Sequence, residues 1–211
     1  MPEVEEYMGS LLQRYDTAVL LEMETEGRER GFPIVERLVG VTLELLARTV
    51  GARRVFELGS GFGYSAHWFS RAVGPDGEVH CTDGDPANEP KALDYLGRAG
   101  LDGPIRWHVG DAVTSLEAID GAFDVIYDDI DKDGYPDAWR AARERIRVGG
   151  LYLCDNVLWS GRAFGLNIDD EDDRVTGEAV AEHNRLIAED ERYVSSIVPT
   201  RDGVMVALRI G

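Results

Sequence analysis

The segment VFELGSGFGYS at residues 55–65 decides the fold of this chain. Its first four residues form a short, mostly apolar run with the character of a buried strand, and a helical pattern begins at Tyr64. Between them, glycines allow a sharp turn and a close approach of the backbone to a ligand. A strand, a glycine-rich turn and a helix in succession are typical of an open α/β sheet, in which ligands bind beyond the carboxyl ends of the strands.

The chain on either side of this segment divides into two parts. Residues 1–52 carry apolar residues at helical spacing, whereas from residue 53 short apolar runs alternate with helical segments. Such alternation predicts a parallel sheet with helices on both faces. We expect a single domain over residues 1–211, with a helical N-terminal extension at 1–52 and a doubly wound, Rossmann-like core at 53–211.

The helical extension contains two apolar series, which Gly31-Phe32-Pro33 separates. The first series predicts one helix that includes residues 4–19, and the second predicts a helix over residues 34–45. Pro33 suits the first turn of the second helix, because an amide hydrogen at that position has no partner within the helix.

The core is expected to contain seven strands. Pro136 fits the first turn of the helix before the fifth strand, and Gly149 lies near the expected end of that helix. Asp202-Gly203 is a typical hairpin turn, so the last two strands should pair antiparallel at one edge of a mostly parallel sheet. The expected strands are 54–58, 78–83, 105–109, 123–129, 150–155, 193–198 and 204–210, and the expected helices are 64–73, 87–99, 135–147 and one after residue 174.

Composition restricts the class of partner. Asp and Glu number 40 against 22 Lys and Arg, a formal net charge of −18 that repels a phosphate backbone and disfavours nucleic acid. No apolar stretch approaches the ~20 residues of a transmembrane helix, and the acidic N-terminus lacks the pattern of a secretory signal. Cys81 and Cys154 lie in apolar runs, as buried thiols of a reducing compartment do. The sequence alone does not exclude a disulfide between them. We therefore expect a cytoplasmic protein without a membrane partner.

The spacing of the glycines helps to distinguish which class of ligand the loop could bind. Gly59, Gly61 and Gly63 form Gly-x-Gly-x-Gly, whereas a dinucleotide site is expected to show Gly-x-Gly-x-x-Gly. Glu57 precedes the glycines, and a carboxylate there repels a pyrophosphate but tolerates a cationic sulfonium ligand. Asp83 ends the second strand, where NAD enzymes also place an acid for the ribose hydroxyls. A tight turn without any ligand is the plain alternative.

Gly110-Asp111-Ala112 follows the third strand at the same edge of the expected sheet. The Asp111 carboxylate could reach the adenine end of a ligand held by the glycine loop. It could equally act as a helix cap or turn residue. The residues alone do not choose between the two.

Two further strand ends carry oxygen-bearing side chains. Asp129 closes the fourth strand, and Asp155-Asn156 closes the fifth. If these strands are neighbours, Asp129, Asp155 and Asn156 offer two carboxylates and one amide oxygen, the ligands that Mg²⁺, Mn²⁺ or Ca²⁺ prefers. An Asp-Asn pair after a strand is, on its own, more often a cap or turn.

Lys132 lies close to this set and is one of only two lysines in the chain. A lysine amine can shift its pKa and exchange protons, which an arginine cannot. Lys132 is therefore a candidate base beside a metal site. The alternative is a salt bridge to Asp128, Asp131 or Asp133.

These segments resemble the cation-dependent O-methyltransferases of the catechol and caffeoyl-coenzyme A type. The resemblance runs from about residue 33 to the C-terminus and is carried by FELGSGFGYS at 56–65, FDVIYDDIDK at 123–132, DNVLWSG at 155–161 and IVPTRDG at 197–203. It implies methyl transfer from S-adenosylmethionine to a hydroxyl of a small catechol-like aromatic substrate, assisted by a divalent cation, magnesium or else manganese or calcium. It also implies a homodimer, with N-terminal helices that pack on the second subunit or cover the active site.

The resemblance assigns roles residue by residue. Asp129, Asp155 and Asn156 match the metal ligands, and Lys132, together with Asp129, matches the catalytic set. The positions that match cofactor contacts are Glu57, Gly59, Gly61, Gly63, Tyr64, Ser65, Asp83, Asp111, Ala112 and Asp129.

Three positions depart from the family's pattern. Asp128 replaces the apolar residue before the metal-binding aspartate and could compete as a ligand. Ile130 stands where the catechol enzymes have a histidine. The acidic run at residues 169–173 either borders the substrate opening or forms a solvated loop.

Three rival functions share parts of this pattern. A nicotinamide-dependent oxidoreductase would use the same sheet and Asp83, but it leaves the three oxygen ligands unexplained. A non-catalytic binding protein has little need for Lys132 beside those ligands. Methylation of tRNA keeps the chemistry and conflicts with the net charge of −18.

Overall fold

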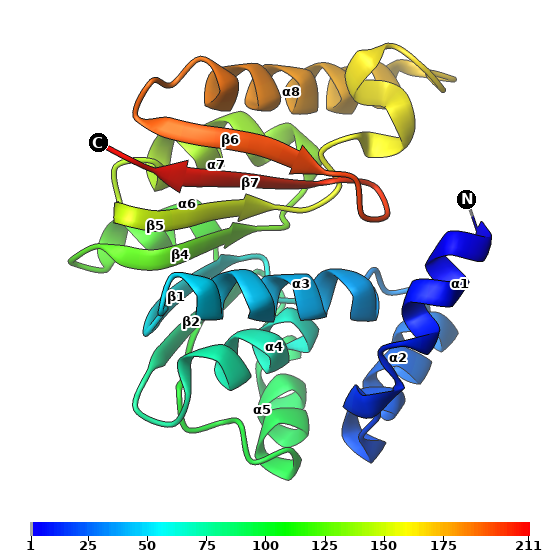
Figure 1. Ribbon diagram of the computed structural model, residues 1–211, viewed down its shortest axis with the longest axis vertical. Helices are drawn as coiled ribbons and strands as arrows, with labels where there is room; N and C mark the ends of the chain where they lie inside the picture. The colour runs from blue at the N-terminus through cyan, green and yellow to red at the C-terminus, as the bar shows by residue number, and fades with distance from the viewer. Residues whose placement is uncertain (1) are drawn as a thin grey trace.

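The computed structural model describes residues 2–211, so Met1 lies outside the described part of the chain. A seven-stranded sheet with the order β3-β2-β1-β4-β5-β7-β6 forms the centre of the molecule (Figure 1). The first five strands run parallel, and β7 pairs antiparallel with both β5 and β6. The predicted fold class is confirmed, including the antiparallel edge pair. The strands are β1 (Arg54–Leu58), β2 (Glu78–Asp83), β3 (Ile105–Val109), β4 (Phe123–Asp128), β5 (Ile146–Cys154), β6 (Tyr193–Val198) and β7 (Val204–Arg209).

Helices cover both faces of this sheet, and the first three α-helices precede β1 in the chain. Among the described residues, no helix is both long and apolar enough to span a bilayer. The α-helices are α1 (Pro2–Ser10), α2 (Ala18–Arg30), α3 (Glu36–Thr49), α4 (Tyr64–Val73), α5 (Asn88–Arg98), α6 (Ala112–Ala118), α7 (Tyr135–Ala142) and α8 (Glu171–Ala188), and the 3-10 turns are η1 (Gln13–Tyr15), η2 (Lys132–Gly134) and η3 (Trp159–Phe164).

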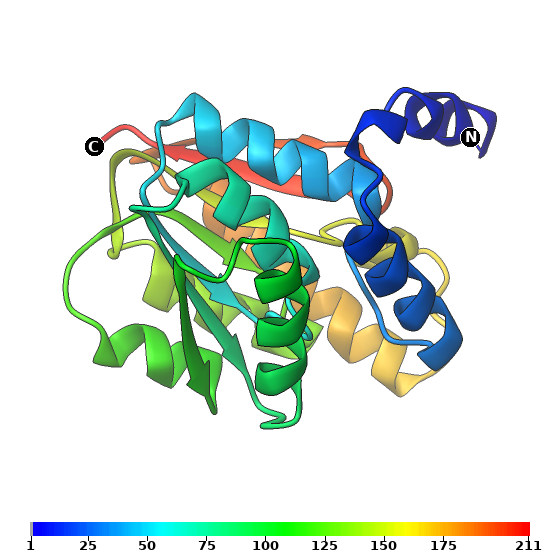
Figure 2. The same cartoon turned by 90° about the horizontal axis from the view of Figure 1, so that it is seen from below.

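Each face of the sheet has its own apolar core, because successive strand side chains point to opposite faces. Val55 packs with residues of α3, α4 and α5, whereas its neighbour Phe56 packs with residues of α6, α7 and α8. Figure 2 shows these helices on the two sides of the sheet. Cys81 belongs to the first core and Cys154 to the second, so both thiols are buried and free.

The N-terminal extension differs from its prediction in two details. The first apolar series belongs to two helices, since α1 ends at Ser10 and α2 begins at Ala18. The break occurs at Thr17, whose hydroxyl oxygen accepts a hydrogen bond from the Leu20 amide and caps α2. Pro33 is not in the first turn of α3, because that helix begins only at Glu36.

Two further predictions in the core need correction, and one helix was missing from the prediction. α7 ends at Ala142, and Gly149 lies inside β5 because Ile146 already pairs with Phe123 of β4. The short helix α6 was not expected. α8 begins at Glu171, earlier than predicted. Pro136 does occupy the first turn of α7, and Asp202-Gly203 does lie in the β6–β7 turn.

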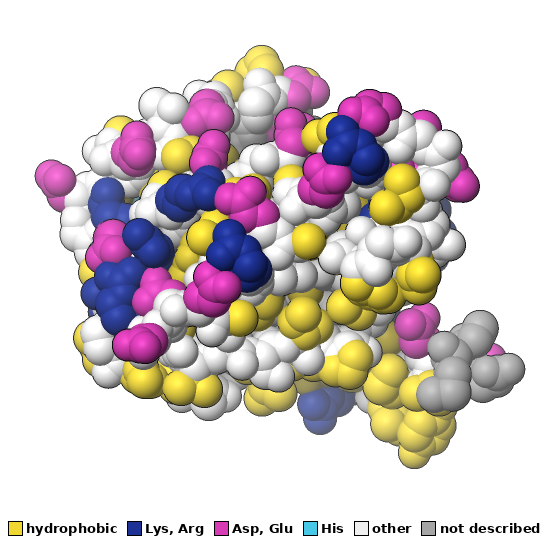
Figure 3. Space-filling model, turned by 90° about the horizontal axis from the view of Figure 1, so that it is seen from above, with side chains coloured by type: hydrophobic (Ala, Val, Ile, Leu, Met, Phe, Trp, Pro, Cys, Tyr) yellow, Lys and Arg dark blue, Asp and Glu magenta, His cyan; other side chains and the backbone are white. Residues whose placement is uncertain are grey.

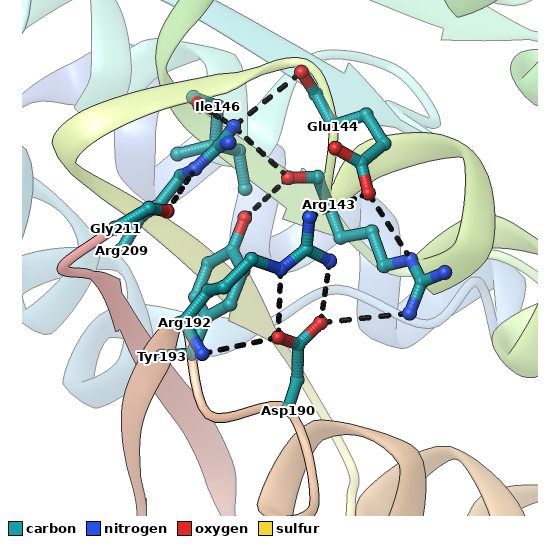
Figure 4. Close-up of polar contacts among 8 residues, drawn as sticks. All are labelled: Arg143, Glu144, Ile146, Asp190, Arg192, Tyr193, Arg209 and Gly211. Carbon is teal, nitrogen blue, oxygen red and sulfur yellow. Dashed lines mark hydrogen bonds and ion pairs between the residues drawn. The ribbon is translucent and has the colours of Figure 1, made fainter.

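An arginine–carboxylate cluster joins β6, β7 and the α7–β5 connection at the end of the sheet where the parallel strands begin (Figure 4). Asp190 accepts hydrogen bonds from the Arg192 guanidinium at 2.8 and 2.9 Å and lies 3.5 Å from an Arg143 nitrogen. The Tyr193 hydroxyl donates to the Arg143 carbonyl oxygen at 2.5 Å. Arg209 donates to the Ile146 carbonyl oxygen at 2.6 Å. These bonds connect β6, β7 and the start of β5 at the amino edge of the sheet.

Candidate active site

The glycine loop between β1 and α4 adopts a backbone conformation that favours glycine at three positions. Gly59, Gly61 and Gly63 have φ values of 82°, 51° and 89°, in the left-handed region that side chains disfavour. A Cβ at Gly59 would also lie 2.6 Å from the Asp129 carbonyl oxygen. The loop is held in place by β2, since the Ser60 amide donates to the Thr82 carbonyl oxygen at 2.8 Å. The turn therefore brings β1 and the end of β4 into close contact.

The candidate residues lie along one edge of the sheet, in the order of its strands. This edge is the one toward which the arrowheads of β4 and β5 point in Figure 1. Five adjacent strands at ~4.8 Å spacing cover about 20 Å, enough for an extended ligand. From β3 across β2, β1 and β4 to β5, the strand ends carry Asp111, Asp83, Glu57 with the glycines, Asp129, and Asp155 with Asn156.

Glu57 is a fully buried acid directly under the glycine loop. One carboxylate oxygen accepts a hydrogen bond from the Ser60 hydroxyl at 2.9 Å, and the other, Oε1, has no partner within residues 2–211. Burial raises the pKa of Glu57 to about 7. A buried oxygen without a partner favours a ligand that brings a hydrogen-bond donor, above all a cationic one.

Other residues of the expected cofactor set have partners in the chain. The Tyr64 hydroxyl donates to Glu24 of α2 at 2.8 Å, so this side chain joins the N-terminal extension to α4. Ser65 is buried in the first turn of α4. Asp83 is half-buried, and one of its oxygens accepts from the Asp85 amide at 2.8 Å.

The Asp111 carboxylate is the N-cap of α6, which begins at Ala112. It accepts a hydrogen bond from the Thr114 amide at 2.7 Å, and the bonds from Thr114 hold the pKa of Asp111 below its ordinary value. Capping is thus one role of this residue. The cap uses one acceptor position of Oδ1, so the carboxylate keeps further acceptor positions for a ligand.

The expected metal ligands lie beyond two adjacent strands, as the prediction required. Asp129 follows β4 and Asp155 follows β5, and the two strands are hydrogen-bonded neighbours. Burial, and then the negative charge of Asp129, raises the pKa of Asp155 to about 7; burial also raises the pKa of Asp129. Lys132 Nζ, 3.4 Å from Asp129 Oδ1, is the only ion-pair partner of either carboxylate in the described chain.

This donor set fits a divalent cation. Burial raises the pKa of both carboxylates, and the charge of Asp129 raises that of Asp155 further, so the pair lacks positive charge, of which one lysine supplies only part. Asn156 follows with φ of 53°, a left-handed conformation that asparagine tolerates, and it begins the turn into η3. Two carboxylates and an amide beside an open edge provide the oxygen ligands that hard cations prefer.

Asp128 does not join this set, contrary to the expectation that it could compete as a ligand. Its side chain points to the opposite face of β4 from Asp129, is fully buried, and accepts a hydrogen bond from the Tyr152 hydroxyl at 2.6 Å. The same hydroxyl lies 3.0 Å from His183 Nε2. Within the described residues, Asp128, Cys154 and His183 form a separate group of potential ligands behind the sheet. The alternation of side chains along the strand separates the two aspartates.

The acidic run at residues 169–173 is largely exposed to solvent, as expected, but most of it forms the start of a helix and not a loop. Asp170 is the N-cap of α8, and the three acids that follow occupy its first turn, where negative charge is favourable at the positive end of the helix dipole. Asp173 also pairs with Arg162 of η3 at 2.6 Å. The run thus joins α8 to the segment after Asn156.

Two residues of this site were missed in the sequence. Tyr135 accepts a hydrogen bond from Lys132 Nζ, and the Trp159 ring lies 5.4 Å from the same nitrogen. Tyr135 follows Lys132 by three residues at a helix start, a spacing that could have indicated the contact. No local signal connects Glu24 with Tyr64, because the two residues come from separate helices.

The fold is that of a protein class whose ligands bind over the carboxyl ends of a parallel sheet, and here that edge carries a carboxylate pair with a lysine. The chain belongs to the O-methyltransferase family, whose sequence profile matches residues 15–210. Catechol O-methyltransferase of Niastella koreensis is 32% identical over 170 residues, which cover 78% of this chain and 76% of that protein. Tapetum-specific methyltransferase 1 of Arabidopsis thaliana is 29% identical over 191 residues, 86% of this chain and 79% of that protein.

A solved structure is similar over almost the whole length. The O-methyltransferase TomG from Streptomyces achromogenes, determined in complex with SAM, superposes with a TM-score of 0.88 at 28% sequence identity. The match covers 99% of this chain and 96% of that one. The N-terminal helices are therefore part of the shared architecture.

Proposed function

We propose that this protein transfers the methyl group of S-adenosylmethionine to one hydroxyl of a small aromatic substrate with two adjacent hydroxyls, with the help of a divalent cation. The observation that carries the proposal is the group of Asp129, Asp155 and Lys132 beside the glycine loop. Similarity to the TomG structure in complex with SAM and to the catechol O-methyltransferase of Niastella koreensis also supports the proposal. The resemblance further suggests that the protein acts as a homodimer in the cytoplasm.

The glycine loop and its flanking acids would hold the cofactor. The backbone at Gly59, Gly61 and Gly63 permits close approach, and the unpartnered Oε1 of Glu57 suits the cationic end of S-adenosylmethionine. Asp83 would accept hydrogen bonds from the ribose hydroxyls. Asp111 with Ala112 would lie toward the adenine. Asp129 belongs both to the proposed cofactor contacts and to the proposed metal ligands, so it would lie beside the reactive methyl.

Asp129, Asp155 and Asn156 would hold the divalent cation, which supplies Lewis-acid polarisation that lowers the pKa of a bound hydroxyl. Lys132 is the group in this site that can receive the hydroxyl proton. The oxygen then forms a bond to the methyl carbon, the carbon–sulfur bond breaks, and its electron pair stays on the sulfur of S-adenosylhomocysteine. Holding the oxygen and the methyl in line contributes up to ~7–11 kcal/mol in favourable systems.

The direct test is a transfer assay with labelled S-adenosylmethionine. Acceptors should include catechols, aliphatic vicinal diols and monohydroxyl phenols, each with Mg²⁺, Mn²⁺ or Ca²⁺ and with excess chelator. We expect transfer to catechols that chelator abolishes and added cation restores. Full activity in excess chelator contradicts the metal's role.

Two further arms of the assay address the rival functions. Labelling of total tRNA in preference to every small acceptor contradicts the proposed substrate class. Calorimetric binding of NAD without binding of S-adenosylmethionine contradicts the proposed cofactor.

A further inference from the structure

Tyr135 lies directly behind the proposed base and is fully buried at the start of α7. Lys132 Nζ donates a hydrogen bond to the Tyr135 hydroxyl oxygen at 2.5 Å. The same hydroxyl donates to the main-chain carbonyl oxygen of Asp155 at 2.8 Å. A hydroxyl can accept and donate at the same time. One phenol therefore links the lysine of the β4–α7 connection to the end of β5, which carries a proposed metal ligand.

The hydrogen bond to Tyr135 is the shortest of the three polar contacts of Lys132 Nζ. This nitrogen also lies 3.2 Å from the Ile130 carbonyl oxygen and 3.4 Å from Asp129 Oδ1. The ammonium group that forms when Lys132 takes up the substrate proton has three hydrogens, one for each of these acceptors. The nitrogen also lies 4.6 Å from the centroid of the Tyr135 ring. A lysine side chain otherwise has about 2 kcal/mol of rotamer entropy, so a fixed amine needs such partners.

The ring of Tyr135 is itself held from behind. It packs against His183 of α8 with ring centroids 5.1 Å apart, and His183 Nε2 lies 3.0 Å from the Tyr152 hydroxyl. Tyr152 in turn donates to Asp128. All four side chains are fully buried. A satisfied polar network in a close-packed core leaves the Tyr135 ring one position, so its hydroxyl has a defined place.

We propose that Tyr135 is a positioning residue for methyl transfer: its hydroxyl holds the Lys132 amine and the Asp155 end of β5 in one fixed relation. The inference rests on the roles proposed above for Lys132 and Asp155. Tyr135 touches neither the substrate nor the cofactor in this scheme. Its loss should therefore reduce turnover and loosen the metal site while cofactor binding stays the same.

The test is Tyr135→Phe in the full-length chain, with Tyr193→Phe as the matched control. Tyr135→Phe keeps the ring against His183 and removes two hydrogen bonds. Tyr193→Phe also removes a bond from a buried phenol to a main-chain carbonyl oxygen, but at the opposite edge of the sheet (Figure 4). The measurements are kcat, KM for both substrates, the Kd of S-adenosylhomocysteine, and the Kd of Mn²⁺ from electron paramagnetic resonance.

We expect Tyr135→Phe to lower kcat by about 10- to 100-fold and to weaken Mn²⁺ binding by about tenfold, as losses of supporting groups around metal sites do. KM for S-adenosylmethionine and the Kd of S-adenosylhomocysteine should stay within about twofold of wild type. Tyr193→Phe should leave all of these kinetic and binding constants unchanged, although its melting temperature falls by as much as that of Tyr135→Phe.

Two outcomes separate this inference from the proposed function. If Tyr135→Phe and Tyr193→Phe have the same kcat and the same Mn²⁺ affinity, Tyr135 has no positioning role. If the wild type methylates no acceptor but Mn²⁺ binding still weakens only in Tyr135→Phe, the proposed reaction is wrong while Tyr135 does position the Asp155 end of β5.

Discussion

The carboxylates at the two edges of the sheet, half-buried at the amino edge and buried at the carboxyl edge, have opposite surroundings. At the amino edge, hydrogen bonds from Arg192 hold the pKa of Asp190 below its ordinary value. Burial alone raises the pKa of Asp124, but the Arg147 guanidinium and two main-chain amides outweigh it and lower that pKa. At the carboxyl edge, Asp155 and Glu57 have no arginine partner in the described chain, and both have a pKa of about 7.

This difference teaches how to separate structural acids from site acids in an acidic protein. A buried carboxylate that is paired inside the chain stabilises the fold, and one left without a cation is available to a ligand. On the face drawn in Figure 3, most basic side chains lie among acidic ones. The net charge of −18 therefore says little about where the functional acids are.

Replacing Asp155 by Asn should have the largest effect on function. The variant loses one of the proposed carboxylate ligands and keeps the side-chain volume, so we expect transfer to fall by about 10³-fold, or about 4 kcal/mol of transition-state stabilisation. Its thermal stability should equal or exceed that of wild type, because a buried charge repelled by Asp129 is removed. Steady-state kinetics with Mg²⁺ and a thermal melt give both values. A marked loss of stability would place Asp155 with the structural acids.

Replacing Glu57 by Gln should change the pH dependence of stability. Because folding raises the pKa of Glu57 from 4.5 to about 7, its contribution is present below pH 4.5 and is lost as the pH rises through 7. The variant should therefore gain about 3 kcal/mol relative to wild type between pH 4.5 and 8. Urea unfolding without cofactor at several pH values measures the difference. The variant should also bind S-adenosylmethionine more weakly at pH 8, and a difference in stability that does not vary with pH would contradict the assignment.

Replacing Asp190 by Asn tests the other edge. The variant removes the carboxylate that accepts two hydrogen bonds from Arg192 and pairs with Arg143, and it leaves both arginines only Glu144 as an acidic partner. We therefore expect a loss of about 2 kcal/mol in the free energy of unfolding. Methyl transfer at a temperature where the variant is folded should stay within twofold of wild type. Denaturant unfolding and an activity assay are sufficient. A large loss of turnover without a loss of stability would remove the distinction between the two edges.

Replacing Asp170 by Ala should have the smallest effect. It removes the N-cap of α8, whose Oδ1 accepts from the Asp173 amide at 2.9 Å, and should cost about 1 kcal/mol of stability. Asp169→Ala is the matched control, because only the main chain of Asp169 makes a hydrogen bond there. We expect neither variant to change KM for the acceptor. A raised KM in Asp170→Ala alone would place this acidic run at the substrate opening.

The fold could be predicted from local patterns to a large extent. Most core strands and helices fall within a few residues of their expected limits, because apolar periodicity and the glycine loop are local properties. The errors occurred where local pattern is ambiguous. Ile146-Arg147-Val148 alternates like a strand but continues a helical segment, and only its pairing with β4 decides the matter.

The position of the candidate site in the fold could be predicted in part, and the roles of its residues stay predictions. The sequence alone determined which acids end the strands, and a parallel sheet brings the ends of β4 and β5 to one edge. Only the tertiary structure decided which acids are paired. It separated Asp128 from Asp129 by the alternation of side chains, and it placed Tyr135 between Lys132 and the main chain of Asp155. The physical reason is that the residue type alone fixes which chemical groups a side chain carries. Which groups it contacts depends on strand register and on packing between segments far apart in the chain.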